Sequence, residues 1–221
     1  MITTDITVQR PKTLKEQSYQ QIRDLLRSGE LIHSQLYSAN ELAERLHVSR
    51  TPVREALLQL ESEGLLVQFD GRGFQPKHHT EKDARDFFAI RKLFELFALK
   101  DMAAHARAHD LELLAEHLEA MRLAAKTDNH DAFIRADENF HLVIVRGCGN
   151  ALVESFWCNI RDLISVFGRQ ALLQPQRMDE AIAEHSAILA ALRRLDASTA
   201  VAALQSHLDA TQSRLVEAFP S

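Results

Sequence analysis

Apolar residues recur at helical spacing along most of this 221-residue chain, and one short segment breaks that pattern. Residues 14–28 predict a first amphipathic helix, and Gly29 marks its end. Ser38 and Glu41 form the S-x-x-E pattern of a capping box, so a second, short helix is expected to begin there. Two helices therefore precede the segment with the most specific pattern.

A third helix is expected almost immediately after the second. Ser49 or Thr51 can cap it, and Pro52 fits its first turn because the missing N–H of proline costs nothing there. After Gly64 the pattern changes to two short strands, LLVQF and RGFQP, around an Asp-Gly turn signal. Two helices joined by a short turn and followed by a hairpin are the layout of a winged helix-turn-helix.

From residue 80 onward the apolar pattern is helical throughout. Six stretches are expected to be helices, at residues 80–108, 110–126, 129–146, 150–172, 176–195 and 197–217. Six consecutive helices predict a bundle with its own core. The expected fold is therefore mainly α, with a winged helix-turn-helix DNA-binding domain at residues 1–77 and an antiparallel all-helical domain for effector binding and dimerisation at residues 78–221.

Charge and composition narrow the function classes. The net charge is −5, and residues 1–77 hold ten basic and ten acidic residues. This balance excludes a protein that coats nucleic acid with its whole surface, whereas specific DNA binding needs only a local basic face. Neither a signal-peptide pattern nor an apolar run of about 18 residues is found, so we expect neither secretion nor membrane spanning. Cys148 and Cys158 are expected to be buried thiols in a reducing cytoplasm.

The third helix carries two arginines near its beginning. Arg50 and Arg54 are four residues apart and share one face, where guanidinium groups reach guanine O6 and N7 or phosphates. The hydroxyls of Ser49 and Thr51 suit phosphate contacts beside the helix N-terminus. The arginine spacing alone fits a solvated surface helix equally well.

The run NELAERLHVSRTPVREALLQLESEGLL resembles the DNA-binding signature of the GntR family of bacterial transcription regulators, and the resemblance continues into residues 70–73. The resemblance implies a regulator that binds double-stranded operator DNA. It implies that Arg50 and Arg54 contact bases or backbone in the major groove, and that Ser49 and Thr51 hold phosphates.

The same resemblance extends to the wing and to the second helix. It implies that Gly71, at the wing tip, approaches the minor groove. Asn40 takes a position where many relatives carry a charged residue that contacts DNA, and LIHSQLYS replaces the family's usual Pro-Gly turn. One such motif reads too few base pairs to select a site in a genome, so we expect a homodimer on a two-fold symmetric operator.

Eleven histidines raise the question of a metal site. Six lie in linkers or among polar neighbours and are expected to be exposed: His78, His79, His105, His109, His117 and His130. Asp137 and His141 share one apolar helix face, and His185 and His207 each lie on another. A single inward histidine is more often a satisfied core residue. Burying all four groups without a common partner costs several kcal/mol, and a divalent ion such as Zn²⁺ or Ni²⁺ supplies that partner.

This set resembles the FCD ligand-binding domain of the FadR subfamily of GntR regulators. In that domain an Asp and three His on separate helices hold a metal, and Asp137, His141, His185 and His207 match the pattern one by one. The resemblance spans residues 80–218, and six helices rather than seven are similar to the shorter VanR-type branch.

Two further residues are candidates for an effector pocket. Arg91 lies close to an apolar face, and the resemblance implies that it clamps a carboxylate of the effector beside the metal. The alternative is an exposed ion pair with Glu95, four residues on. Asn159 interrupts an apolar stripe and is expected to face the same cavity. The stripe consists of Leu152, Phe156, Leu163 and Val166.

The sequence therefore predicts a transcription regulator, expected to be a repressor, that responds to a small carboxylate effector bound next to a divalent metal. A direct metal sensor, in which the ion itself is the signal, is an alternative. A metal-dependent enzyme is a second, because open metal positions could activate a substrate. Against it, Glu138 and Glu184 adjoin ligand candidates but are turned about 100° away on their helices.

Overall fold

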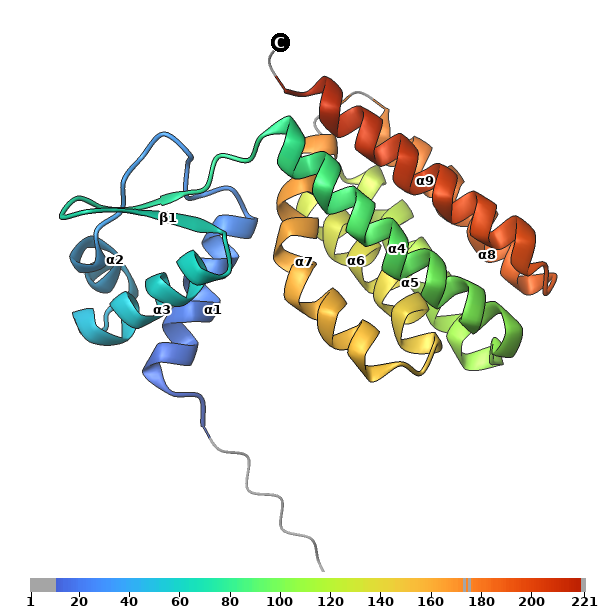
Figure 1. Ribbon diagram of the computed structural model, residues 1–221, viewed down its shortest axis with the longest axis horizontal. Coiled ribbons are helices and arrows are strands. Elements are labelled where there is room, and N and C mark those ends of the chain that lie inside the picture. The colour runs from blue at the N-terminus through green and yellow to red at the C-terminus, as the bar shows by residue number, and fades with distance from the viewer. Residues whose placement is uncertain (1–10, 173, 175, 220–221) are drawn as a thin grey trace, which may run out of the picture. The chain divides into compact units, whose positions relative to one another are not determined.

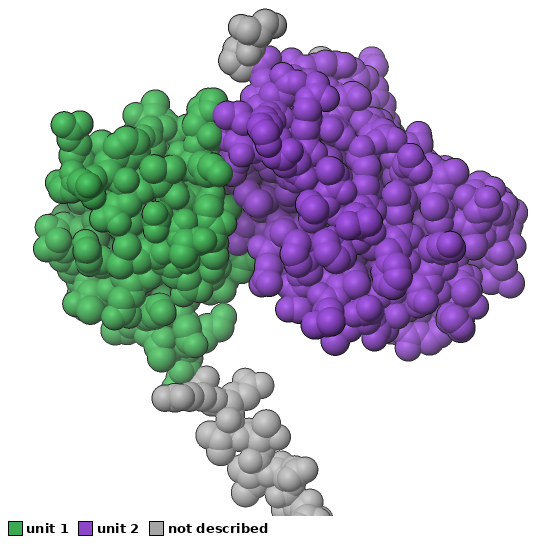
Figure 2. All heavy atoms as spheres, in the orientation of Figure 1, with its two compact units in different colours: residues 1–78 green, residues 79–221 purple. Residues whose placement is uncertain are grey.

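The computed structural model describes residues 11–172, 174 and 176–219. They form two compact units, one ending at His78 and the other beginning at His79 (Figure 1, Figure 2). Within the described residues, the first unit holds three helices and a two-stranded hairpin, and the second holds six helices. This architecture confirms the predicted fold class.

The first unit begins with three short helices. Their bounds, with those of the strands, are α1 (Leu14–Arg27), α2 (Ala39–Leu46), α3 (Arg50–Ser62), β1 (Leu66–Phe69) and β2 (Gly73–Pro76). Capping boxes begin α1 and α2, formed by Thr13 with Glu16 and by Ser38 with Glu41. Three residues separate α2 from α3, and His47 among them has the left-handed conformation, with φ 55°. This tight turn holds α3 against α2.

A small apolar core holds these helices together. α1 packs against α3, and α2 packs against the same helix. The fully buried side chains at the centre are Ile22, Leu42, Val53, Leu57 and Leu60. Burying each contributes about 2 kcal/mol, so the inner face of α3 is committed to the core and its outer face is left to solvent.

The wing is tied to the loop before α2. β1 and β2 are antiparallel, with Phe69 opposite Gly73. Tyr37 adds a bridge, because its N–H donates to the Phe74 carbonyl at 2.7 Å and the Phe74 N–H donates back at 2.9 Å. The Tyr37 hydroxyl accepts a hydrogen bond from the Ile32 N–H at 3.0 Å. Tyr37 thus closes the loop that lacks the usual Pro-Gly turn.

The second unit is a bundle arranged around α6. Its helices are α4 (Glu81–His105), α5 (Ala108–Lys126), α6 (His130–Gly147), α7 (Ala151–Leu172), α8 (Arg177–Arg193) and α9 (Ala197–Glu217). α6 packs against α4, α5 and α7, while α9 lies along α4 and α8 (Figure 1). A helix surrounded on three sides is apolar around most of its circumference. Polar groups on the inner side of α6 are therefore buried.

Gly73 is a position where only glycine fits. Its φ is +134°, and a Cβ there would lie 2.7 Å from the Tyr37 carbonyl oxygen. We expect Gly73→Ala to lower the free energy of unfolding by about 3 kcal/mol, measured by urea denaturation. Gly71→Ala is the control, because a Cβ at Gly71 has no neighbour within 4 Å and only the left-handed φ of +67° opposes it, at about 1 kcal/mol. Equal losses in both variants would contradict this reading of the wing.

Candidate functional site

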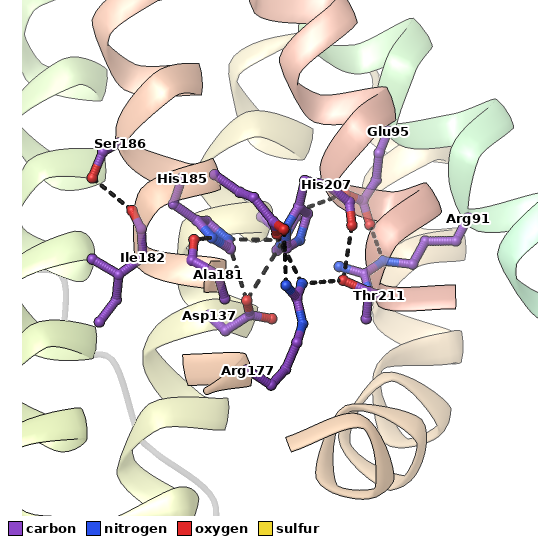
Figure 3. A network of polar contacts seen from close by, with 12 residues as sticks. Arg91, Glu95, Asp137, Arg177, Ala181, Ile182, His185, Ser186, His207 and Thr211 are labelled. Atoms are coloured by element: carbon purple, nitrogen blue, oxygen red, sulfur yellow. Dashed lines mark hydrogen bonds and ion pairs between the residues drawn. The ribbon is translucent and has the colours of Figure 1, made fainter. Parts of the chain in front are cut away.

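Four polar side chains from three helices converge inside the six-helix unit (Figure 3). Asp137 and His141 come from α6, His185 from α8 and His207 from α9, and one ligand atom of each lies within 4.8 Å of the others. His185 Nε2 lies 3.2 Å from His141 Nε2 and 3.2 Å from Asp137 Oδ1. The three rings are buried, and 20% of the Asp137 side chain is exposed. The structure thus brings together the four residues that the sequence singled out.

Each of the three imidazole rings has an oxygen atom close to its other nitrogen, Nδ1. These oxygens are Glu95 Oε2 at 2.6 Å from His141, the Ala181 carbonyl at 2.7 Å from His185 and Glu184 Oε2 at 2.6 Å from His207. A ring nitrogen this close to an oxygen lone pair carries the proton, because two lone pairs would repel each other. The Nε2 lone pair of each ring is then left facing the cluster.

The cluster fits a divalent metal ion. Two unprotonated Nε2 atoms 3.2 Å apart repel unless a proton or a cation lies between them. A proton satisfies one such contact, whereas one divalent ion serves all four groups. An oxygen partner on the second ring nitrogen is also typical of metal-ligating histidines. Three imidazoles and one carboxylate suit Zn²⁺ or Ni²⁺.

The pKa shifts have the directions that metal ligands need. Burial alone would raise the pKa of Asp137, but the charge of His141 and then the hydrogen bond and charge of His185 outweigh it and hold that pKa well below its ordinary value. Burial, followed by the charges of His185 and His141, lowers the pKa of His207 well below its ordinary value. A carboxylate and a neutral imidazole are the forms that bind a metal.

Arg91 and Glu95 form a buried pair beside the cluster. Arg91 Nε donates to Glu95 Oε1 at 2.6 Å, and neither side chain is more than 3% exposed. The sequence allowed an exposed pair on a solvated surface, and the pair forms in the core instead. Arg91 Nη2 is buried and has no hydrogen-bond partner among the described residues. A buried donor of this kind is free to bind an anion.

A cavity of about 30 Å³ adjoins the cluster, with room for about two water molecules. Its polar lining includes Arg91, Asp137, His207, Arg177 and Thr211. Its apolar lining comes largely from α6 and α7, and includes Phe133, Ile134, Ile164, Ala171 and Leu172. The cavity is therefore mostly apolar, with its polar groups gathered at the cluster.

A second buried arginine, Arg177, was not predicted from the sequence. Its Nη1 and Nη2 each donate to one Glu184 oxygen at 2.8 Å, and Nη2 also donates to Thr211 Oγ1 at 2.7 Å. Helical spacing places Glu184 on the polar side of α8. The pattern of α8 alone therefore does not indicate that Glu184 supports the cluster. Only the contact with His207 on α9 reveals that it supports the cluster.

Several predictions of side-chain placement are wrong. Cys158 was expected to be buried but is exposed, and Cys148, His117 and His130 are half-buried. Asn159 is exposed and is absent from the cavity lining, because its apolar stripe lies on the outer side of α7, with Leu152 81% and Phe156 38% exposed. His79 was expected to be exposed but is only 6% exposed, because its ring packs edge-on against Phe167 with the centroids 5.0 Å apart.

In the first unit, the predicted DNA-contacting residues are all exposed. They are Asn40, Ser49, Arg50, Thr51, Arg54 and Gly71. Within the described part of the chain, the side chains of Arg50 and Arg54 form no ion pair and no hydrogen bond. Arg72, beside Gly71 at the wing tip, is equally exposed and was not singled out from the sequence.

The beginning of α3 differs from that of α1 and α2. Its N-cap residue, Ser49, makes no side-chain cap hydrogen bond, and its first turn holds no acidic residue. The N-terminal N–H groups of α3 are therefore left without the capping side chain that serves the other two helices. Together with Arg50 and Arg54, this end of α3 suits an anionic ligand such as a phosphate.

No helix in the part of the chain that the structure describes is long and apolar enough to cross a membrane.

Family models match both units. The model described as bacterial regulatory proteins, gntR family, matches residues 14–75, and the FCD domain model matches residues 86–210. The HTH-type transcriptional repressor NanR of Escherichia coli (strain K12) is 30% identical over 229 aligned positions, which cover 91% of this chain and 84% of NanR. The HTH-type transcriptional regulator YdhC of Bacillus subtilis (strain 168) is 25% identical over 206 positions, covering 93% of this chain and 92% of YdhC.

A solved structure shares the fold. The chain resembles Escherichia coli McbR/YncC with a TM-score of 0.79 and 24% identity, over 93% of this chain and 98% of that one. These matches agree with the resemblance carried by the sequence motifs.

Proposed function

This chain belongs to the gntR family of bacterial regulatory proteins and carries an FCD domain, and on that premise we propose that it is a repressor controlled by a small carboxylate bound beside a divalent metal. It is a transcription regulator and not an enzyme. The observation that carries the proposal is the convergence of Asp137 and three histidines beside the free buried donor of Arg91. NanR is named as a repressor, and this similarity supports repression rather than activation.

DNA binding is assigned to α3 and the wing. Arg50 and Arg54 lie on the exposed face of α3 and are unpaired among the described residues, so their guanidinium groups are available to bases in the major groove. Ser49 and Thr51, with the uncapped end of the helix, hold phosphates. Gly71 at the wing tip approaches the minor groove. Asn40, exposed in the first turn of α2, adds a contact.

The metal is held by Asp137, His141, His185 and His207, and when bound it supplies positive charge and open coordination positions for an oxygen ligand. The charged side chains of this set and its nearest contacts are three carboxylates and two guanidinium groups, namely Asp137, Glu95, Glu184, Arg91 and Arg177. Glu180 also lies 3.6 Å from Arg177, but Arg214 pairs with it and cancels its charge. With neutral imidazoles their formal charge is −1, and a divalent ion changes it to +1. A buried positive site favours an anion over a neutral ligand.

The effector is a small carboxylate whose anionic group faces Arg91 Nη2. An organic acid is larger than the cavity of about 30 Å³, so binding requires the apolar walls on α6 and α7 to move. Such a movement couples to DNA affinity if the effector favours one arrangement of the two DNA-binding units. We expect the change at residues 75–80, which comprise the end of β2 and the segment that joins it to α4.

The homodimer is assigned to an exposed apolar face on α4 and α7. It consists of Ile90, Leu93, Phe97, Leu152 and Phe156, all at least 38% exposed. Phe94 of α4 and Phe156 of α7 stack with ring centroids 4.3 Å apart, so the two helices present one continuous face. A second copy is the proposed occupant, because a two-fold operator requires two recognition helices and an isologous contact places the same face on both partners.

The second candidate is a direct metal sensor, favoured by the same cluster of four ligands. Metal affinity separates the two functions. A sensor releases its ion within the cellular concentration range, whereas a metal that forms a fixed part of the effector site survives purification.

Arg54→Ala should weaken operator binding by about 1 to 3 kcal/mol, because an exposed, unpaired guanidinium at the start of α3 is lost. A mobility-shift titration on DNA fragments retained by the purified protein measures this, and Arg50→Ala should behave similarly. The control is Arg45→Ala, whose side chain is paired with Glu30. If Arg54→Ala binds the operator as tightly as the wild type, the assignment of DNA contact to Arg54 is wrong.

Wild-type protein should carry one divalent ion per chain, and His185→Ala should carry none or much less, as measured by elemental analysis. With free metal at 100 times its Kd, the wild type should unfold with a free energy about 3 kcal/mol higher than after chelation, because only the folded cluster binds the ion. The stability of the variant should be the same with and without the chelator. His117→Ala, a half-buried residue of α5, is the control. The same metal content in wild type and His185→Ala would show that the ion is bound elsewhere.

Calorimetry against a panel of organic and sugar acids should identify an anionic effector, and neutral compounds should not bind. Arg91→Ala should weaken the binding of that effector by about 1.5 to 3 kcal/mol, which is the contribution of a hydrogen bond to a charged group. Arg85→Ala on the same helix is the control, because its exposed pair with Glu81 faces solvent. Binding of neutral molecules alone, or full affinity in Arg91→Ala, contradicts the effector assignment.

Leu93→Glu should convert the dimer to a monomer at micromolar concentration, because a buried, unpaired charge is introduced at the centre of an apolar interface. Light scattering gives the mass of each species. Leu123→Glu is the matched control, since Leu123 on α5 is 63% exposed and Leu93 is 65% exposed. If Leu93→Glu stays dimeric, the interface lies elsewhere.

A further inference from the structure

Glu95 contacts three side chains from three different helices. Its Oε1 accepts a hydrogen bond from Arg91 Nε at 2.6 Å (Figure 3). Oε1 also accepts from Trp157 Nε1 at 3.2 Å, and Oε2 lies 2.6 Å from His141 Nδ1. The carboxylate is completely buried. One side chain of α4 therefore contacts a neighbour on its own helix, a cluster residue on α6 and the indole of a residue on α7.

We propose that Glu95 is a positioning residue that holds the anion clamp Arg91 and the metal ligand His141 on one carboxylate, so that anion affinity and metal affinity both depend on it. This inference rests on the proposed function, because it takes His141 as a metal ligand and Arg91 as the clamp. It adds that the two binding events share a support that touches neither ligand directly.

The contact with Arg91 fixes which donor is left for an anion. Glu95 Oε1 engages Nε, while Nη2 remains buried without a partner among the described residues. An arginine without this contact would be a buried cation free to take other rotamers, and ordering it on binding would cost side-chain entropy. Glu95 therefore orients the guanidinium group before the anion arrives.

The contact with His141 fixes the tautomer of the ring. A carboxylate oxygen 2.6 Å from Nδ1 keeps the proton on that nitrogen and leaves the Nε2 lone pair for the cluster. Loss of the carboxylate removes this preference. The ring could then place its proton on Nε2, the atom that lies 3.2 Å from His185 Nε2, and a protonated Nε2 cannot bind a metal.

Glu184 provides a matched comparison within the same unit. It also supports a cluster histidine, His207, through Nδ1, and it also pairs with a buried arginine, Arg177. Both Nη atoms of Arg177 already donate to protein acceptors, whereas Arg91 Nη2 donates to none among the described residues. Glu184 should therefore influence metal affinity alone, whereas Glu95 should influence both affinities.

Glu95→Gln separates the two contacts by chemistry rather than by size. The amide has one oxygen and one NH₂ group where the carboxylate had two oxygens. If NH₂ faces Arg91, two donors oppose each other and the clamp is displaced. If NH₂ faces His141, it donates to Nδ1 and drives the ring proton to Nε2. In either orientation one contact is lost and the other becomes a neutral hydrogen bond, about half as strong as a bond to a carboxylate, so both supports weaken.

The test uses the full chain, with Co²⁺ and acetate as probes. Competition with a chelator gives the Co²⁺ affinity, and acetate titration at saturating Co²⁺, followed by the visible absorption of the metal, gives the anion affinity. Glu95→Gln should lower Co²⁺ affinity about 10- to 100-fold and acetate affinity at least about fivefold. Glu184→Gln should lower Co²⁺ affinity alone. If Glu95→Gln does not fold, Glu95→Asp replaces it, and its shorter side chain should lose both affinities because it cannot reach Arg91 and His141 together.

The outcomes separate this inference from the proposed function. A wild type that binds neither Co²⁺ nor acetate overturns both. A wild type that binds both probes, beside a Glu95→Gln variant with unchanged Co²⁺ affinity or unchanged acetate affinity, overturns the positioning role and leaves the proposed function standing. If Glu95→Gln and Glu184→Gln lower acetate affinity equally, the cause is a general loosening of the bundle, and this result would also overturn the positioning role of Glu95.

Discussion

Several lone pairs directed at one point inside an apolar bundle repel one another, and the six-helix unit is arranged around that constraint. Asp137 and the ring nitrogens of three histidines face each other from three helices, in surroundings where an unpaired polar group costs free energy. A single divalent ion would remove the conflict, and it would be held only while α6, α8 and α9 remain in register. The chemistry of the centre and the packing of the helices therefore stabilise each other.

The supporting contacts follow from the same constraint. Each imidazole can offer its Nε2 lone pair only if Nδ1 keeps the proton, so each needs an oxygen behind it. Two of those oxygens belong to carboxylates, and buried carboxylates need cations in turn, which Arg91 and Arg177 provide. The result is a shell of alternating charges, in which both Nη atoms of Arg177 donate to protein acceptors and Nη2 of Arg91 has no acceptor among the described residues.

The sequence predicted what periodicity along one helix can reveal. The elements of both units, the shared face of Asp137 and His141, and the apolar flanks of His185 and His207 all depend on residues three or four positions apart. Contacts between helices leave no such trace, so Glu95 and Glu184 were not recognised as supports of the cluster. Asn159 was misplaced for a related reason: α7 is apolar on two sides, and a period of 3.6 does not say which side faces the core.

The contact between Trp157 and Glu95 has an experimental consequence. Trp157 is the only tryptophan in the chain, and its indole N–H donates to the carboxylate that lies beside the cluster. The emission of a buried indole depends on the polarity and charge around it. The natural protein therefore carries its own fluorophore beside the centre, and rearrangements there could be followed in real time without attaching a dye.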